Sequence, residues 1–147
     1  MAGSIRRARP EDHARITAIR NSVSENVLSD PGQVTVEDYR WFEQSPGVWV
    51  WEENGTILGF SAADTRDGSI WALFVAPGHE RRGIGRALFD KACDVLLENG
   101  HRTALLTTSP GTRAEGFYRA AGWQAIGTSP RGELIFHAVL RPGGTRL

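Results

Sequence analysis

Hydrophobic and polar positions change their period several times along the chain, and each change predicts a new element. Residues 47–77 contain three strand-like runs, divided at Asn54-Gly55 and Asp67-Gly68, which are dipeptides typical of tight hairpin turns. This segment therefore predicts an antiparallel meander of three strands. Further strand-like runs are found at residues 4–9, 102–108, 123–129 and 133–140.

Helical spacing marks several of the segments between these strands. Pro10 and two acidic residues begin a predicted helix at 10–23, whose buried stripe includes Ile16 and Ile19. A loop rich in turn-forming residues then leads to a second predicted helix at 36–45. A short helix within 112–123 and a final hairpin complete the expected order of elements.

The most regular helical stripe lies between two predicted strands. It ends at Asn99-Gly100, which favours a left-handed helix end, and its buried side consists of Ile84, Leu88, Ala92, Val95 and Leu96. A strand, a helix and a strand in this order predict a right-handed crossover with parallel pairing. Because the meander is antiparallel, the expected fold class is α/β (α+β), with a mixed central sheet flanked by helices.

Size and charge limit the kinds of function. A chain of 147 residues has the usual size of one domain, so we expect a single domain over 1–147. Seventeen Lys and Arg balance seventeen Asp and Glu, which argues against a broad nucleic-acid surface.

The one cysteine, Cys93, allows no internal disulfide and is expected to be a small, partly buried filler. No run resembles a signal peptide, a membrane span or a set of metal ligands, so we expect a cytoplasmic protein without membrane or metal partners.

The basic glycine turn that precedes the most regular helix is the strongest candidate for chemistry. Gly83 and Gly85 stand where backbone amides have no intrahelical partner, and their missing side chains let an anion approach. The charges of Arg81, Arg82 and Arg86 are added at the same place. The pattern is compatible with a phosphate site or with an ordinary strand-to-helix turn whose arginines are solvated.

Two common phosphate-binding motifs do not fit this turn. A dinucleotide-binding Gly-x-Gly-x-x-Gly would need a third glycine at the position of Leu88. A P-loop would need Gly-Lys followed by Ser or Thr after the turn, and that sequence is missing. The residues therefore indicate a phosphate cradle of another kind.

The chain resembles the GNAT N-acetyltransferases, which use acetyl-CoA. Residues 73–89, LFVAPGHERRGIGRALF, are similar to the pyrophosphate-binding segment of that family, and 114–123, AEGFYRAAGW, are similar to its later helix. The resemblance covers nearly the whole chain. It implies one acetyltransferase domain with a first strand, acceptor-side helices and meander at 1–66, a pyrophosphate-binding core at 67–109, and a helix with a hairpin at 110–140.

The resemblance also implies roles for individual residues. Backbone near Phe74 and Val75 would pair with the pantetheine arm, and Phe117 and Tyr118 would lie near the coenzyme, with Tyr118 close to its sulfur. The pyrophosphate would be held by amides of Arg81, Arg82, Gly83, Ile84, Gly85 and Arg86. The sequence departs from the usual family pattern at two positions, where Glu80 replaces Gln or Arg and Gly111 replaces Asn.

Acetyl transfer to an amine needs a proton donor for the departing thiolate and an acceptor for the amine proton. A tyrosine has a pKa of about 10 and is protonated at neutral pH, so Tyr118 is the candidate acid. Glu25 is the first candidate base, followed by Asp30 and Asp64. His79 lies in the basic turn, where a histidine is usually only solvated.

Two further residues are candidates for the acceptor side, Asn26 through its amide and Trp71 through its ring. We therefore predict an enzyme that transfers acetyl from acetyl-CoA to a primary amine of a small molecule or peptide. The alternative is a non-catalytic acyl-CoA-binding module that senses or regulates a partner. A homodimer is compatible with the exposed sheet edges.

Overall fold

The computed structural model describes residues 3–22, 47–80 and 82–141. Its centre is a seven-stranded mixed sheet with the order β1-β2-β3-β4-β5-β7-β6, in which β4 and β5 are parallel and the other neighbours are antiparallel. The strands are β1 (Ser4–Arg7), β2 (Val48–Glu53), β3 (Thr56–Asp64), β4 (Ser69–Val75), β5 (Thr103–Thr108), β6 (Gln124–Thr128) and β7 (Leu134–Val139). The helices are η1 (Pro10–Asp12), α1 (His13–Ser22), α3 (Ile84–Glu98) and α4 (Arg113–Ala120).

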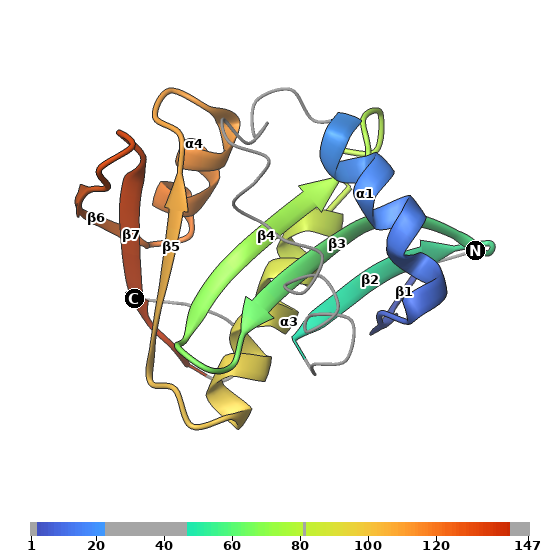
Figure 1. The fold of residues 1–147 in the computed structure, drawn as a ribbon, viewed down its shortest axis with the longest axis horizontal. Coiled ribbons are helices and arrows are strands. Elements are labelled where there is room, and N and C mark those ends of the chain that lie inside the picture. The colour runs from blue at the N-terminus through green and yellow to red at the C-terminus, as the bar shows by residue number, and fades with distance from the viewer. Residues whose placement is uncertain (1–2, 23–46, 81, 142–147) are drawn as a thin grey trace.

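The helices cover the two faces of this sheet unequally (Figure 1). On one face, α1 buries Ile16 and Ile19 against β2, β3 and β4. On the opposite face, α3 and α4 pack against the sheet, and Phe89 and Tyr118 share one core with Phe136 of β7. Alternating side chains of each strand supply both cores, as the period of a strand requires. The predicted mixed sheet with flanking helices is confirmed.

Turns and helix ends lie where the sequence places them. Asn54 and Gly55 both have positive φ values, 51° and 79°, as the tight turn between β2 and β3 requires. The five predicted stripe residues of α3 are buried, and the helix ends at Asn99 before Gly100, which has a φ of 91°. The N-terminal helix differs in detail because its first turn, η1, is a 3-10 turn. The predicted helix at 36–45 lies outside the described residues.

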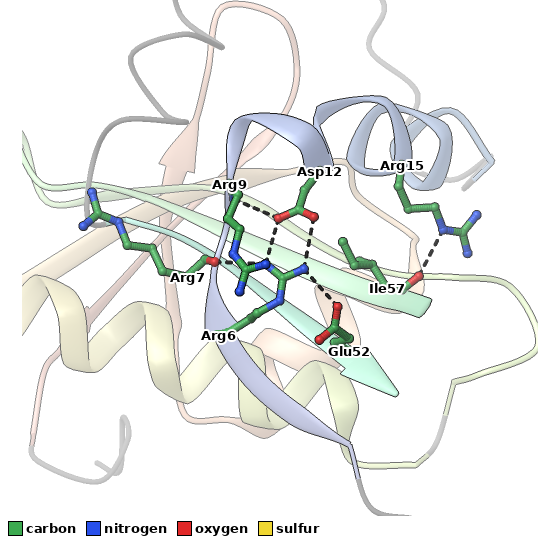
Figure 2. Close-up of polar contacts among 7 residues, drawn as sticks. All are labelled: Arg6, Arg7, Arg9, Asp12, Arg15, Glu52 and Ile57. Carbon is green, nitrogen blue, oxygen red and sulfur yellow. Dashed lines mark hydrogen bonds and ion pairs between the residues drawn. The ribbon is translucent and has the colours of Figure 1, made fainter. Parts of the chain in front are cut away.

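A network of charged groups joins the start of α1 to the sheet (Figure 2). The Arg6 guanidinium binds both carboxylate oxygens of Asp12, at 2.8 and 3.1 Å, and Glu52 of β2 at 3.0 Å. Asp12 also accepts the backbone N–H of Arg9 at 2.8 Å. One turn later, Arg15 donates to the Ile57 carbonyl at 3.0 Å. These bonds fix the position of α1 over β2 and β3.

A β-bulge in β4 gives the sheet its one marked irregularity near the parallel pair. Its register with β3 steps from Ala62 opposite Ala72 to Ala63 opposite Ile70, so Trp71 is the extra residue. A bulge bends its strand and increases the local twist. Beyond the bulge β4 diverges from β5, as Figure 1 shows.

Candidate active site

The diverging ends of β4 and β5 leave backbone groups directed into the space between the strands. The two strands pair at Ser69 and Leu105, before the bulge. On the other edge of β4, the Ala76 N–H donates to Leu58 O at 2.8 Å. Antiparallel bonds recur at every second residue, so the Phe74 backbone is also directed toward β3. The backbone groups of Leu73 and Val75 point the other way, toward β5.

This geometry refines the expected pantetheine contacts. Val75 has the orientation that a contact with an extended arm between the strands requires, whereas Phe74 contributes a buried ring stacked on Phe60 at 5.4 Å. Leu73 has the same backbone orientation as Val75. Leu73 is therefore a further candidate for a backbone contact, which the sequence analysis did not name because the register of β4 was not known.

The N-terminus of α3 lies near the end of β4 at which β4 and β5 diverge, because only the turn after Val75 connects β4 to α3. The first i to i−4 hydrogen bond of the helix runs from the Ala87 N–H to Gly83 O at 3.0 Å. The preceding amides, including those of Gly85 and Arg86, therefore lack a partner within the helix. Gly83 has a φ of 81° and no side chain to cap them. These amides are oriented as an anion-binding site requires.

The N-terminus of α4 shows the ordinary alternative. The Thr112 hydroxyl accepts the Glu115 N–H at 3.3 Å, and Glu115 places a carboxylate in the first turn. Capping and an acidic first turn satisfy that helix from its own residues. The first turn of α3 contains no acidic residue. The two helix starts thus differ in the features that favour an external anion.

The arginines of the turn have acidic partners that the sequence did not reveal. Arg82 binds Glu53 at 2.5 Å and approaches His79 Nδ1 at 3.1 Å, while Arg86 pairs with Asp90 at 3.2 Å. Part of the positive charge expected for phosphate is therefore already neutralised. Arg81 lies outside the described residues.

The side chain of Glu80 turns back into its own loop. Its Oε1 accepts the Gly78 N–H at 2.5 Å, and its other oxygen lies 3.7 Å from Arg113 of α4. Backbone N–H groups, first among several causes, hold the pKa of Glu80 below its usual range. Its negative charge is thus directed to the loop and to α4. Sequence reasoning missed Arg113, which contacts the turn only through the fold.

Tyr118 lies in an aromatic cluster between α3, α4 and β7. It is 7% exposed, and its ring lies 5.6 Å from Phe89, 5.5 Å from Phe117 and 6.0 Å from Phe136, centroid to centroid. Burial, with a smaller contribution from Cys93, raises the pKa of the hydroxyl above its usual value. The phenol is therefore protonated at neutral pH, as a proton donor must be. Cys93 is fully buried at 1% exposure, deeper than the partly buried position expected.

The acceptor-side candidates are only partly described. Glu25, Asn26 and Asp30 lie outside the described residues. Asp64 is 2% exposed, and both of its carboxylate oxygens are bonded to Arg66, at 2.8 and 2.9 Å. Burial raises the pKa of Asp64, but the hydrogen bonds from Arg66 outweigh it and the net pKa is low. A paired carboxylate of low pKa is a poor base. Asp64 instead holds Arg66 in the β3–β4 turn through these hydrogen bonds.

Trp71 is exposed at the bulge, at 42%. Its Nε1 donates to Ser69 Oγ at 3.0 Å, and Ser69 Oγ lies 2.6 Å from Asp67 Oδ1. The ring is thus tethered to the start of β4.

Across the described part of the chain, no group of three or more His, Cys, Asp or Glu side chains is arranged to hold a metal ion. None of the described helices is long and apolar enough to span a membrane.

The protein is an α/β domain in which the diverging parallel strands and the uncapped helix start have the geometry that favours an anionic, extended ligand. The model of the acetyltransferase (GNAT) family matches residues 14–123, so the chain belongs to this family. The resemblance noted in the sequence is confirmed.

Curated relatives carry acetyltransferase names. A mycothiol acetyltransferase of Beutenbergia cavernae is 32% identical over 66% of this chain and 36% of its own length. The peptidyl-lysine N-acetyltransferase YiaC of Escherichia coli is 38% identical over 53% of this chain and 50% of its own. The chain thus spans half or less of these two relatives.

Solved structures share the fold at low identity. The acetyltransferase YncA of Salmonella typhimurium, solved with acetyl-CoA, has a TM-score of 0.76 at 20% identity and covers 96% of this chain and 95% of its own. PaiA of Thermoplasma acidophilum, solved with coenzyme A, has a TM-score of 0.75 at 16% identity and covers 93% and 98%. At these identities the likeness establishes the fold.

Proposed function

We propose that this protein transfers the acetyl group of acetyl-CoA directly to a primary amine of a small molecule or peptide. The observation that carries the proposal is the combination of an uncapped α3 N-terminus with the open, parallel edges of β4 and β5. The first supplies amides for a pyrophosphate, and the second supplies backbone partners for an extended amide-containing arm. By name, the two curated relatives are a mycothiol acetyltransferase and a peptidyl-lysine N-acetyltransferase, which supports the reaction class.

The coenzyme would bind along β4. The pyrophosphate would meet the amides from Gly83 to Arg86, with charge from Arg82 after exchange of its Glu53 partner. The arm would run back along β4 past Val75 and Leu73. The acetyl end would then lie toward the closed end of the strand pair, near Trp71.

The chemical step would use one acid and one base. The amine nitrogen forms a bond to the thioester carbonyl carbon, the carbon–sulfur bond breaks, and the sulfur takes a proton from the Tyr118 hydroxyl. Glu25 would accept the amine proton directly or through water, and Asn26 would orient the acceptor. The tyrosine regains a proton from solvent, and Glu25 releases to solvent the proton that it accepted. Each role follows from the family resemblance and the protonation state that the reaction needs.

Release of free coenzyme A thiol tests the proposal. The purified protein is given acetyl-CoA and a panel of primary amines, and thiol release is expected only when protein, acetyl-CoA and an accepted amine are all present. Calorimetry measures acetyl-CoA binding separately. Tight binding without thiol release across the panel would identify an acyl-CoA-binding module instead.

A further inference from the structure

Three residues at the start of β4 form a hydrogen-bonded chain that ends on an exposed indole. Trp71 Nε1 lies 3.0 Å from Ser69 Oγ, which lies 2.6 Å from Asp67 Oδ1. An indole N–H only donates and a carboxylate only accepts, so the serine hydroxyl donates to Asp67 and accepts from Trp71. The Ser69 N–H adds a second bond to the same carboxylate oxygen, at 3.0 Å.

The hydrogen bonds from Trp71 to Ser69 and from Ser69 to Asp67 determine which surface of the indole is available to a ligand. Its one polar atom is already bonded within the protein, so the remaining surface of the ring is apolar or aromatic. Hydrogen bonds in sequence polarise one another, so the carboxylate of Asp67 strengthens the bond that holds the indole N–H. Such a ring attracts apolar groups and cations through its face.

A second exposed apolar side chain lies on the adjacent strand. Leu105 of β5 is opposite Ser69 in the parallel register and is 42% exposed, equal to Trp71. Ala104, Leu106 and Ile70 face the core beneath α3, so Leu105 and Ser69 face the opposite side of the sheet. The bond from Trp71 to Ser69 draws the indole to that side as well.

The position of this pair relates it to the proposed reaction. Trp71 is the bulge residue at which β4 leaves β5, and the coenzyme arm proposed above would end there. α3 and α4 cover the other face of the sheet, whereas α1 packs over β2, β3 and β4 on the face of Trp71 and Leu105. Among the described residues both side chains are still exposed there, so an acceptor would approach the thioester from this face. An exposed apolar pair beside the reacting carbon would select the acceptor.

We infer that Trp71 and Leu105 form an apolar wall that selects primary amines with an aromatic or aliphatic group close to the reacting nitrogen, and that Ser69 and Asp67 are positioning residues for the indole. The inference rests on the proposed acetyl transfer and names the class of its acceptor. Polar amines of the same length would gain nothing from this wall.

The test compares 2-phenylethylamine with ethanolamine, two primary amines whose two-carbon chains end in a phenyl or a hydroxyl group. The wild-type protein is expected to prefer 2-phenylethylamine in kcat/KM by at least tenfold, because loss of an apolar contact in a binding site changes discrimination by about 10-fold or more. Trp71→Ala should remove most of this preference by raising the KM for the amine, with the KM for acetyl-CoA unchanged.

Variants of the tether separate positioning from packing. Ser69→Ala keeps the ring and should lower the preference about threefold, and Ser69→Thr should restore it because the hydroxyl is retained. Ile126→Ala is the matched control, since Ile126 is an exposed apolar residue of β6, at 59%. An unchanged preference in Trp71→Ala, or an equal loss in Ile126→Ala, overturns the inference.

A binding measurement distinguishes this inference from the proposed function. Calorimetry follows 2-phenylethylamine binding to the protein saturated with coenzyme A. Binding that is weakened by Trp71→Ala, without turnover of any amine, would support the wall and refute the enzyme. Turnover with a preference independent of Trp71 would refute the wall alone, and failure of both binding and turnover would refute both.

Discussion

Glu53 at the end of β2 and Arg82 in the turn after β4 form an ion pair with an N to O distance of 2.5 Å, although 29 positions separate them. The Trp51 indole N–H also binds Glu53, at 3.1 Å, and this bond, followed by that from Arg82, holds the pKa of Glu53 below its usual range. The carboxylate is therefore charged at neutral pH. It competes with any phosphate for the arginine.

Glu53→Gln should therefore tighten acetyl-CoA binding. The substitution releases Arg82 and removes a negative charge near the phosphates. Exposed ion pairs contribute little to stability, so the gain should be at most about fivefold in affinity. Calorimetry at low and high salt measures it, and the gain should shrink as salt screens the charge. Glu133→Gln makes the same change of net charge in the β6–β7 turn. An equal gain in acetyl-CoA affinity in that variant would show that the Glu53–Arg82 pair has no specific effect.

Gly83→Val should weaken coenzyme binding at least tenfold, in addition to its effect on stability. Gly83 and Gly100 stand at opposite ends of α3, with φ values of 81° and 91°, and a Cβ would meet no atom within 4 Å at either. Valine at either position should cost about 1–3 kcal/mol of backbone strain. Only at Gly83 would the side chain also cover the amides of the first turn.

Urea unfolding and acetyl-CoA calorimetry on both variants measure these two effects. The Gly100→Val protein should keep its affinity, whereas Gly83→Val should lose at least tenfold. Equal affinities in two folded variants would show that the coenzyme does not use this helix end.

Tyr118→Phe should lower turnover by about 10² to 10⁴ while acetyl-CoA affinity holds, because the ring remains in the aromatic cluster and only the proton donor is lost. Turnover is measured under single-turnover conditions, where chemistry limits the rate. The raised pKa keeps the wild-type hydroxyl protonated through the neutral range, so no loss of activity from Tyr118 is expected until well above its ordinary pKa. An unaltered chemical rate would assign Tyr118 to packing.

Asp12→Asn should destabilise the fold by about 1–3 kcal/mol at neutral pH, because Arg6 would lose a charged partner within a partly buried network. The bond from Arg6, the largest of several causes, lowers the pKa of Asp12 in the folded protein. Stability from Asp12 is thus complete above the unfolded pKa of about 4 and is lost as pH falls through the lower folded pKa.

Urea unfolding of wild type and Asp12→Asn between pH 6 and 2.5 isolates this contribution from that of other acids. The two curves should converge toward the acidic end. A constant difference at all pH values would exclude titration of Asp12 as its source.

The sequence predicts features that depend on local period and turn chemistry. The stripe of α3, the turn at Asn54 and Gly55, and the parallel crossover are all of this kind. The same alternation predicts that Trp49 and Trp51 share one face, and both meet the side of α3, with Lys91 Nζ lying 4.0 Å from the Trp49 ring centroid.

Features that depend on register or on distant partners were missed. The bulge at Trp71 changes which backbone atoms of β4 face β5, and nothing in the local pattern fixes its position. The partner of Arg82 comes from another hairpin, and the partner of Glu80 comes from α4. A pattern read along one strand carries no information on such pairs, so the charge available for phosphate was overestimated.

Because Cys93 is fully buried, the rate at which its thiol is labelled reports local unfolding of the protein around α3. Burial raises the pKa of this thiol to about 12, so in the closed protein it offers neither access nor thiolate to a labelling reagent. Modification must wait for α3 to separate from the sheet, and its rate then follows the fraction of open molecules when closing is fast. Because Cys93 is the only cysteine, the signal comes from one place, and a ligand that binds only the closed protein slows it by mass action. Slow labelling also means that the protein adds almost no background to a thiol-detecting assay of its own turnover.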